Sequence, residues 1–159
     1  MILFLAGLIA GMVITLIVII FFAQSFMFAE KECKYDFEQS VELLTNSALE
    51  NGWKVPAVHD LRETMLKFGK PEVAQAKVFE ICHPDHAIEI LSRDKERKIM
   101  PMMPCRIAVY QKSDGKCYVS VMQNGLLGSL MKGVVPRVMR AASRESHMII
   151  QAILPDHQK

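Results

Sequence analysis

The chain begins with a long stretch of apolar residues, and no charged side chain occurs before Glu30. The only polar side chains in this stretch are Thr15, Gln24 and Ser25. A helix of about 20 apolar residues crosses the hydrocarbon core of a bilayer, and it satisfies its own backbone hydrogen bonds there. The sequence therefore predicts a single-pass membrane protein with a transmembrane helix over 1–28.

A cleaved signal peptide is the alternative interpretation of this stretch, and the sequence disfavours it. The start of the chain has no basic residue, the apolar run exceeds the roughly 7–15 residues of a signal sequence, and an Ala-x-Ala cleavage pattern is missing. Lys31 and Lys34 follow the run among acidic residues, so the positive-inside rule leaves the side of the membrane unresolved. We expect a retained anchor and favour an extracytoplasmic, periplasmic position for the rest of the chain.

Two glycines in the apolar stretch, Gly7 and Gly11, are one helical turn apart, with Ala6 and Ala10 beside them. Small residues on one helix face let a second helix approach closely. The alternative is that glycine and alanine are simply common in membrane helices. The pair predicts helix packing, either with a membrane-protein partner or in a homodimer.

The remainder of the chain is long enough for one ordinary domain of about 130 residues. Its charges are interspersed, and the net charge of +2 argues against a nucleic-acid partner. The expected organisation is an anchor over 1–28, a short linker over 29–35 and one domain over 36–155.

The domain shows alternating helix and strand patterns, so a two-layer α+β fold is expected. Asp114-Gly115 marks a turn between two strands and predicts an antiparallel hairpin. Because strand side chains alternate, Val109 should be buried and Tyr110 should face the other way. Helices are expected over 37–51, after Asp60, from 84 and over 136–154, with strands over 53–59, 76–82, 103–111 and 116–122.

The stretch PCRIAVYQKSDGKCYVSVM resembles the signature of domain-of-unknown-function family 302 (DUF 302). The segment FEICHPDHAIEIL also resembles that family, with His83 where Asn is usual, and Asn51-Gly52-Trp53 resembles the end of its first helix. The resemblance covers most of 37–141. It implies a small α+β fold, often paired in dimers, and no settled activity.

Four residues form the most suggestive group for metal chemistry: Cys82, His83, His86 and Cys105. Two thiolates and two imidazoles suit tetrahedral zinc. The spacing matches no standard zinc pattern, and free cysteines are more commonly small core residues. A zinc site and a purely structural role therefore both stand as interpretations of this group.

Three methionines precede Cys105, namely Met100, Met102 and Met103. Thioether and thiolate ligands select Cu(I), and methionine or histidine can bind haem, although methionine also fills cores. Cys105 with a distant histidine is a conceivable nucleophile pair. No cofactor is required by the sequence, and the four cysteines, which include Cys33 and Cys117, do not settle the redox compartment.

Three hypotheses about function follow. The first is a membrane-anchored, non-catalytic accessory or interaction subunit of a membrane protein complex. The second is a metal- or haem-binding domain displayed at the membrane, and the third is a thiol-dependent enzyme. The first is favoured, because it needs only the anchor, the small-residue pair and a compact domain.

Overall fold

The computed structural model describes the backbone of 2–156 and the side chains of that range except at 2, 3, 5, 6, 23–26 and 126. Five strands form one antiparallel sheet in the order β1-β5-β4-β3-β2. The α-helices are α1 (Ile2–Met27), α2 (Phe37–Glu50), α3 (Leu61–Lys67), α4 (Pro84–Leu91), α5 (Asn124–Ser129) and α6 (Val135–Ile150). The strands are β1 (Phe28–Glu32), β2 (Lys54–Asp60), β3 (Ala76–Cys82), β4 (Cys105–Gln111) and β5 (Cys117–Met122). Short 3₁₀ helices cover Arg97–Met102 and Gln151–Ile153.

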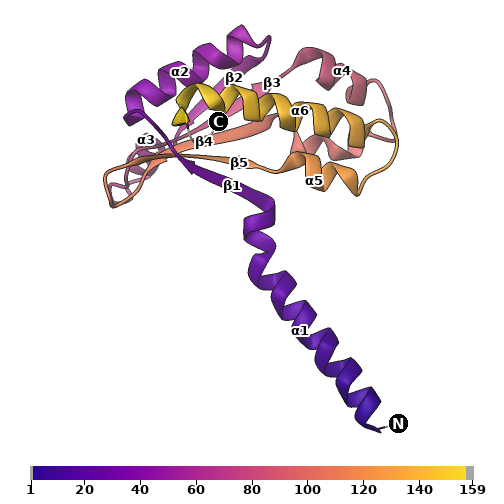
Figure 1. Cartoon of the computed structure of the whole chain (residues 1–159). Helices are drawn as coiled ribbons and strands as arrows, with labels where there is room; N and C mark the ends of the chain where they lie inside the picture. The colour runs from indigo at the N-terminus through magenta and orange to yellow at the C-terminus, as the bar shows by residue number, and fades with distance from the viewer. Residues whose placement is uncertain (1, 157–159) are drawn as a thin grey trace.

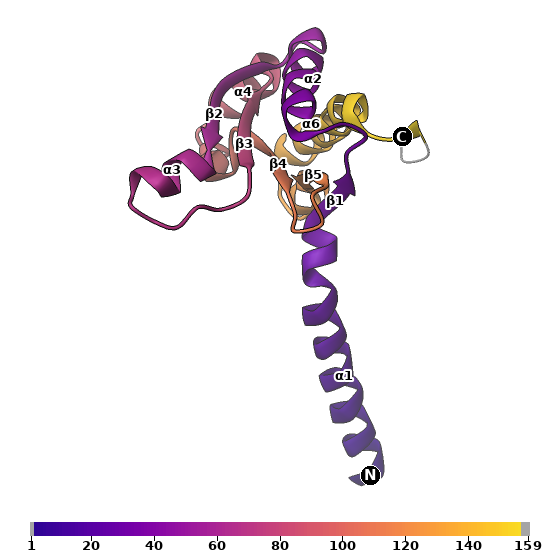
Figure 2. The same cartoon turned by 90° about the vertical axis from the view of Figure 1, so that its left-hand side faces the viewer.

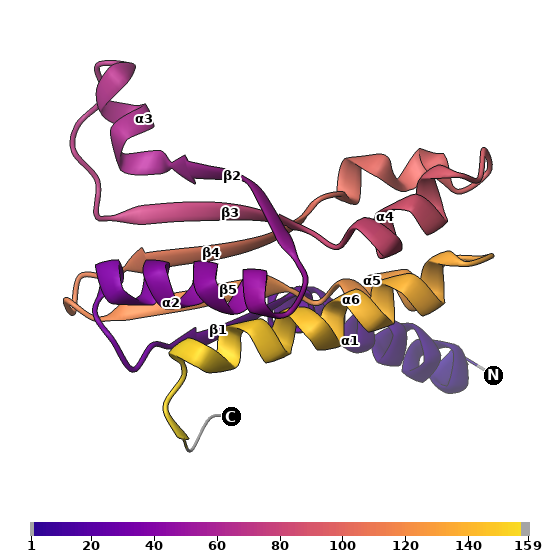
Figure 3. The same cartoon turned by 90° about the horizontal axis from the view of Figure 1, so that it is seen from above.

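Helices α2 and α6 lie side by side on one face of the sheet (Figures 1 and 3). Alternate residues of the three central strands point into this layer and are buried: Phe79, Ile81, Ile107, Val109, Val119 and Val121. The expected α+β fold, with its hairpin β4–β5, is confirmed. Val109 is fully buried and Tyr110 faces the other side of the sheet, as the strand period predicts.

The helix ends follow local sequence signals. The side chain of Asp36 accepts a hydrogen bond from the backbone N–H of Gln39 and so begins α2. Gly52, at φ +80°, ends that helix in a conformation that other residues rarely adopt. Pro84 occupies the first turn of α4, where its missing N–H costs nothing.

The segment expected to be a linker contains most of β1, which pairs with β5 along the outer edge of the sheet. The alternation in β1 is hard to detect, because Lys31 and not an apolar residue follows Ala29 on its face. Glu30 and Glu32 lie on the other face, where Glu30 accepts hydrogen bonds from Tyr110 and Lys112. Cross-strand polar contacts therefore hold β1, and burial contributes less.

Helix α1 extends away from the domain (Figure 2). Among the residues that the structure describes, no helix is long and apolar enough to cross a membrane. This finding contradicts the predicted single-pass transmembrane helix over 1–28 and, with it, the predicted membrane localisation.

The contacts of Glu30 predict an acid-dependent stability. The hydrogen bonds from Lys112 and Tyr110 hold the pKa of Glu30 below its usual value. A carboxyl with a lowered pKa in the folded state stabilises the fold above its unfolded pKa of about 4.3. That contribution is lost as the pH falls through the lower, folded pKa. We expect Glu30→Gln to lower the Tm at pH 7 and to differ little from the wild type near pH 3.

Thermal unfolding at a series of pH values measures this effect. Glu38→Gln, an exposed carboxylate in α2, is the matched control and should keep the pH dependence of the wild type. A Tm gap for Glu30→Gln that stays constant down to pH 3 would contradict the assigned contacts.

Candidate functional site

A small cavity lies between α4, α6 and the adjoining ends of β3 and β4. Its volume of about 30 Å³ is the room that one water molecule or one ion needs. All four residues singled out in the sequence, Cys82, His83, His86 and Cys105, line it. The structure therefore brings together side chains that β3, α4 and β4 contribute separately.

Local sequence explains how the two histidines reach the cavity. Cys82 ends β3, His83 adopts an extended conformation just before α4, and Pro84 starts that helix. His86 follows within the first turn of α4, so both imidazoles lie at the same helix end. Their ring centroids are 4.6 Å apart.

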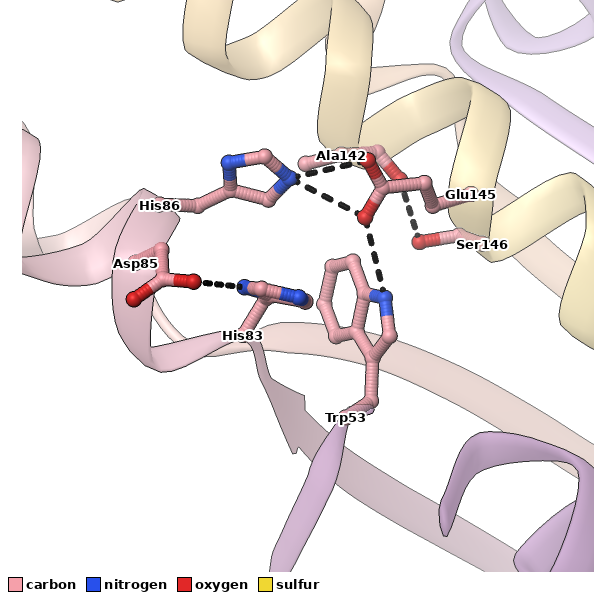
Figure 4. A network of polar contacts seen from close by, with 7 residues as sticks. All are labelled: Trp53, His83, Asp85, His86, Ala142, Glu145 and Ser146. Carbon is pink, nitrogen blue, oxygen red and sulfur yellow. Dashed lines mark hydrogen bonds and ion pairs between the residues drawn. The ribbon is translucent and has the colours of Figure 1, made fainter. Parts of the chain in front are cut away.

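Trp53 completes an aromatic cluster with these two histidines (Figure 4). Its ring centroid lies 5.7 Å from that of His83 and 6.1 Å from that of His86, both in edge-to-face orientations. Trp53 is only 1% exposed, and it is the one tryptophan of the chain. Its fluorescence therefore reports on this cavity alone.

Glu145 of α6 holds the cluster in place. Its carboxylate accepts a hydrogen bond of 3.1 Å from Trp53 Nε1 and lies 3.0 Å from His86 Nε2 through each oxygen (Figure 4). A carboxylate only accepts hydrogen bonds, so Nε2 of His86 must carry a proton. Sequence reasoning missed Glu145, because 59 residues separate it from His86 and 92 from Trp53, and no local pattern marks it.

His83, unlike His86, has a buried ring nitrogen, Nδ1, without a hydrogen-bond partner among the side chains that the structure describes. The nearest carboxylate oxygen, on Asp85, is 4.0 Å away, which is beyond hydrogen-bond distance, and that side chain is 91% exposed. Buried polar atoms without a partner are rare in native proteins, and this one needs an explanation.

Cys105 is a partly buried thiol that stays protonated near neutral pH. Burial raises the pKa of Cys105 to about 11, and the Asn124 amide, which donates to Sγ at 3.6 Å, offsets only part of that rise. Burial also raises the pKa of Cys82. A nucleophilic cysteine needs a lowered pKa, so this environment does not supply an activated thiolate.

The four candidate residues do not form a preassembled zinc site. Over the described part of the chain, no group of three or more His, Cys, Asp or Glu side chains is placed to hold a metal ion. Cys105 pairs with Ile81 across β3 and β4, and Cys82 is the next residue. Successive strand residues alternate in direction, and Cys82 lines both this cavity and a second pocket with Pro56 and Glu80.

The methionines before Cys105 also separate in the structure. Met103 lines the cavity beside Cys105, and Met102 packs against the buried cluster beneath α4 and α6. Met100 is 47% exposed. Of these three, Met103 alone therefore brings a thioether to the site, where Met139 of α6 also lines the cavity.

Gly7 and Gly11 lie far from this cavity, on α1, where they line a shallow groove with Leu8, Met12 and Thr15. A Cβ added at either glycine would meet nothing within 4 Å. Thr15 Oγ1 donates to the carbonyl oxygen of Gly11 at 2.8 Å, so the backbone of the same helix satisfies its hydroxyl group. The groove is open and apolar.

The fold and this cavity define a small α+β domain whose helical layer covers one sheet face and closes over a cluster of imidazole and sulfur groups. The chain belongs to the family described as "Domain of unknown function DUF302", whose model matches residues 29–153. This match confirms the resemblance seen in the sequence. No curated protein matches the chain.

Among solved structures, the chain is similar to one described as "Crystal structure of uncharacterized conserved protein DUF302 from Bacillus stearothermophilus". The TM-score is 0.71 at 16% identity, and the match covers 80% of this chain and 98% of that chain. At this identity the likeness supports the shared fold.

The contacts of Glu145 lead to a prediction. Glu145→Ala leaves the Trp53 and His86 donors without their partner, which costs about 1–3 kcal/mol. We expect a lower Tm and a changed Trp53 emission spectrum, measured by thermal unfolding and steady-state fluorescence. Arg144→Ala, at the exposed neighbouring position, should change neither. An unchanged Trp53 spectrum in Glu145→Ala would contradict the hydrogen bond.

Proposed function

We propose that this chain is a non-catalytic metal-binding protein whose cavity holds one Cu(I) ion. One observation carries the proposal: the sulfur atoms of Met103 and Cys105 and the imidazole of His83 line a cavity of single-ion size, and the buried Nδ1 of His83 has no partner. Nδ1 of His83 faces Asp85, 4.0 Å away (Figure 4), and a cation bound beside it would give that nitrogen a partner.

The chemistry of the lining residues favours Cu(I) over zinc or haem. Zinc in structural sites takes four ligands in a tetrahedron, and among the described residues no three His, Cys, Asp or Glu side chains are placed to hold a metal ion. Soft thiolate and thioether ligands select Cu(I), and Met103 with Cys105 offers one of each. A haem is much larger than a cavity of about 30 Å³.

The surrounding residues would each have a distinct role. The Cys105 thiol would lose its proton when the metal binds, and the Asn124 amide would stabilise the resulting thiolate. Glu145 would fix the orientation of His86 beside His83 through the hydrogen bond at Nε2. Ile90, Val138 and Ala142 line the cavity with apolar surface and would exclude water.

A thiol-dependent enzyme is less well supported by the same residues. The raised pKa of Cys105 keeps its thiol protonated, and the hydrogen bond between His86 and Glu145 engages the imidazole nitrogen nearest α6. The proposal keeps the non-catalytic role from the accessory-subunit hypothesis and leaves out the membrane anchor.

Cu(I) titration of the reduced full-length chain against a competing chelator tests the proposal. We expect one Cu(I) per chain and quenching of the Trp53 fluorescence. Cys105→Ser and His83→Ala should each weaken binding by about tenfold or more, which corresponds to 1.4 kcal/mol. Met103→Leu should weaken it less, because a thioether is an uncharged ligand.

The matched controls remove a thioether and an imidazole that lie outside the cavity. Met100→Leu removes an exposed thioether and His59→Ala an exposed imidazole, and both should bind like the wild type. Binding that depends on Cys33 and Cys117, with Cys105 and His83 dispensable, would overturn the proposal.

We infer a second function, assembly of two copies through α1, from a separate observation. The described apolar side chains of α1 are exposed, for example Phe4 at 75% and Ile14 at 61%. Helices that are apolar on all sides are normally covered. The groove along Gly7 and Gly11 fits an identical helix, because a twofold pair brings the same small residues together.

Gly7→Leu with Gly11→Leu would fill this groove and keep the helix apolar. We expect the double variant of the full-length chain, in mild detergent that disperses apolar side chains, to lose the dimer in cross-linking and sedimentation experiments. Ile9→Leu with Val13→Leu, on the opposite side of α1, is the matched control and should dimerise normally. A dimer that persists in the glycine variant would place the interface elsewhere.

A further inference from the structure

Two buried cysteines outside the cavity, Cys33 and Cys117, lie opposite each other at the outer edge of the sheet. Glu32 pairs with Tyr118 in the β1–β5 ladder, so the next antiparallel pair along the ladder is Cys33 with Cys117. The backbone N–H of Cys33 donates to the carbonyl oxygen of Cys117 at 2.8 Å. Both side chains belong to the buried core, at 7% and 4% exposure.

This placement suits a covalent bond between the two sulfur atoms. Directly opposed residues in an antiparallel pair share a sheet face and have Cα atoms about 4.5–5.5 Å apart. Disulfides span Cα separations of about 4.4–6.8 Å. Each thiol shifts the pKa of the other, so the two sulfur atoms lie near each other.

We propose that Cys33 and Cys117 are a reversible redox pair, which closes to a disulfide that fastens β1 to β5. This inference is independent of Cu(I) binding, since neither residue lines the cavity. Cys105 begins β4, whereas Cys117 pairs with Gln111 at the other end of that strand, so Cys82 and Cys105 do not compete for the bond.

The bond would form by thiol–disulfide exchange with a small-molecule or protein disulfide as the oxidant. The hydrogen bond from Cys33 lowers the pKa of Cys117, which makes Cys117 the attacking thiolate. It attacks one sulfur of the oxidant, whose S–S bond breaks and releases the first thiol. Cys33 then gives up its proton and attacks the Cys117 sulfur of the mixed disulfide, which releases the second thiol. Two protein thiols are oxidised and one disulfide is reduced to two thiols.

Access to these buried thiols comes from the position of β1. It is an edge strand with β5 as its one strand neighbour, so local opening of that single ladder exposes both sulfur atoms. Edge elements open at lower free energy than the core of a sheet. In the oxidised chain the same opening would be blocked, and β1 with α1 would stay joined to the domain.

Oxidation of the full-length chain with a range of oxidised and reduced glutathione ratios tests the proposal. We expect the chain to lose about 2 Da, and a non-reducing digest to link the peptides that carry Cys33 and Cys117. Closing the long loop from 33 to 117 should raise the Tm by about 10 °C. Cys33→Ser and Cys117→Ser should lack both the link and the shift.

The double variant Cys82→Ser with Cys105→Ser is the control and should still form the link. If a serine variant at Cys33 or Cys117 fails to fold, the digest of the wild type alone remains decisive. Recovery of Cys33 and Cys117 as free thiols in excess oxidised glutathione, after incubation long enough for edge opening, would overturn the proposal. So would a link through Cys82 or Cys105.

Discussion

The structure depends on strict alternation in the three central strands. Phe79, Ile107 and Val121 meet in register, and so do Val109 and Val119. Because these side chains all point to one face, the sheet presents a continuous apolar surface that α2 and α6 must cover. The side chains of Tyr110 and Tyr118 occupy the other face, where their rings stack at 6.3 Å. A register shift of one residue would exchange the two faces completely.

The same alternation determines what each cysteine does. Cys105 continues the buried face of β4 and therefore reaches the cavity beneath α6, whereas Cys82 lies one position beyond the buried Ile81. Cys117 begins the buried face of β5 and meets Cys33 there. Four cysteines that look equivalent in the sequence thus divide into two that line the cavity, Cys82 and Cys105, and one buried pair, Cys33 and Cys117.

Local sequence patterns were sufficient to predict the helices and strands in which they occur. The caps at Asp36 and Asp60, the Asp114-Gly115 turn and the alternation around Val109 located the helices and strands of the domain. Cys82, His83, His86 and Cys105 were grouped in the sequence as a possible metal site, and all four line one cavity, while their metal role stays a prediction. The role of Glu145 could not be predicted from the sequence, because its contacts with Trp53 and His86 arise only from packing. Strand β1 was missed because its pairing depends on Glu30 contacts across the sheet, and the predicted transmembrane span was contradicted.

The junction between α1 and the domain has a geometric consequence. Helix α1 ends at Met27 and β1 begins at Phe28 without an intervening residue. The backbone N–H of Gln123 donates to the carbonyl oxygen of Met27 at 2.8 Å, so the last helical residue is already fastened to the sheet. The helix thus acts as a lever arm whose angle is set by β1 and β5. Whatever holds α1 would also orient the whole domain, and the mouth of its cavity would point in one fixed direction.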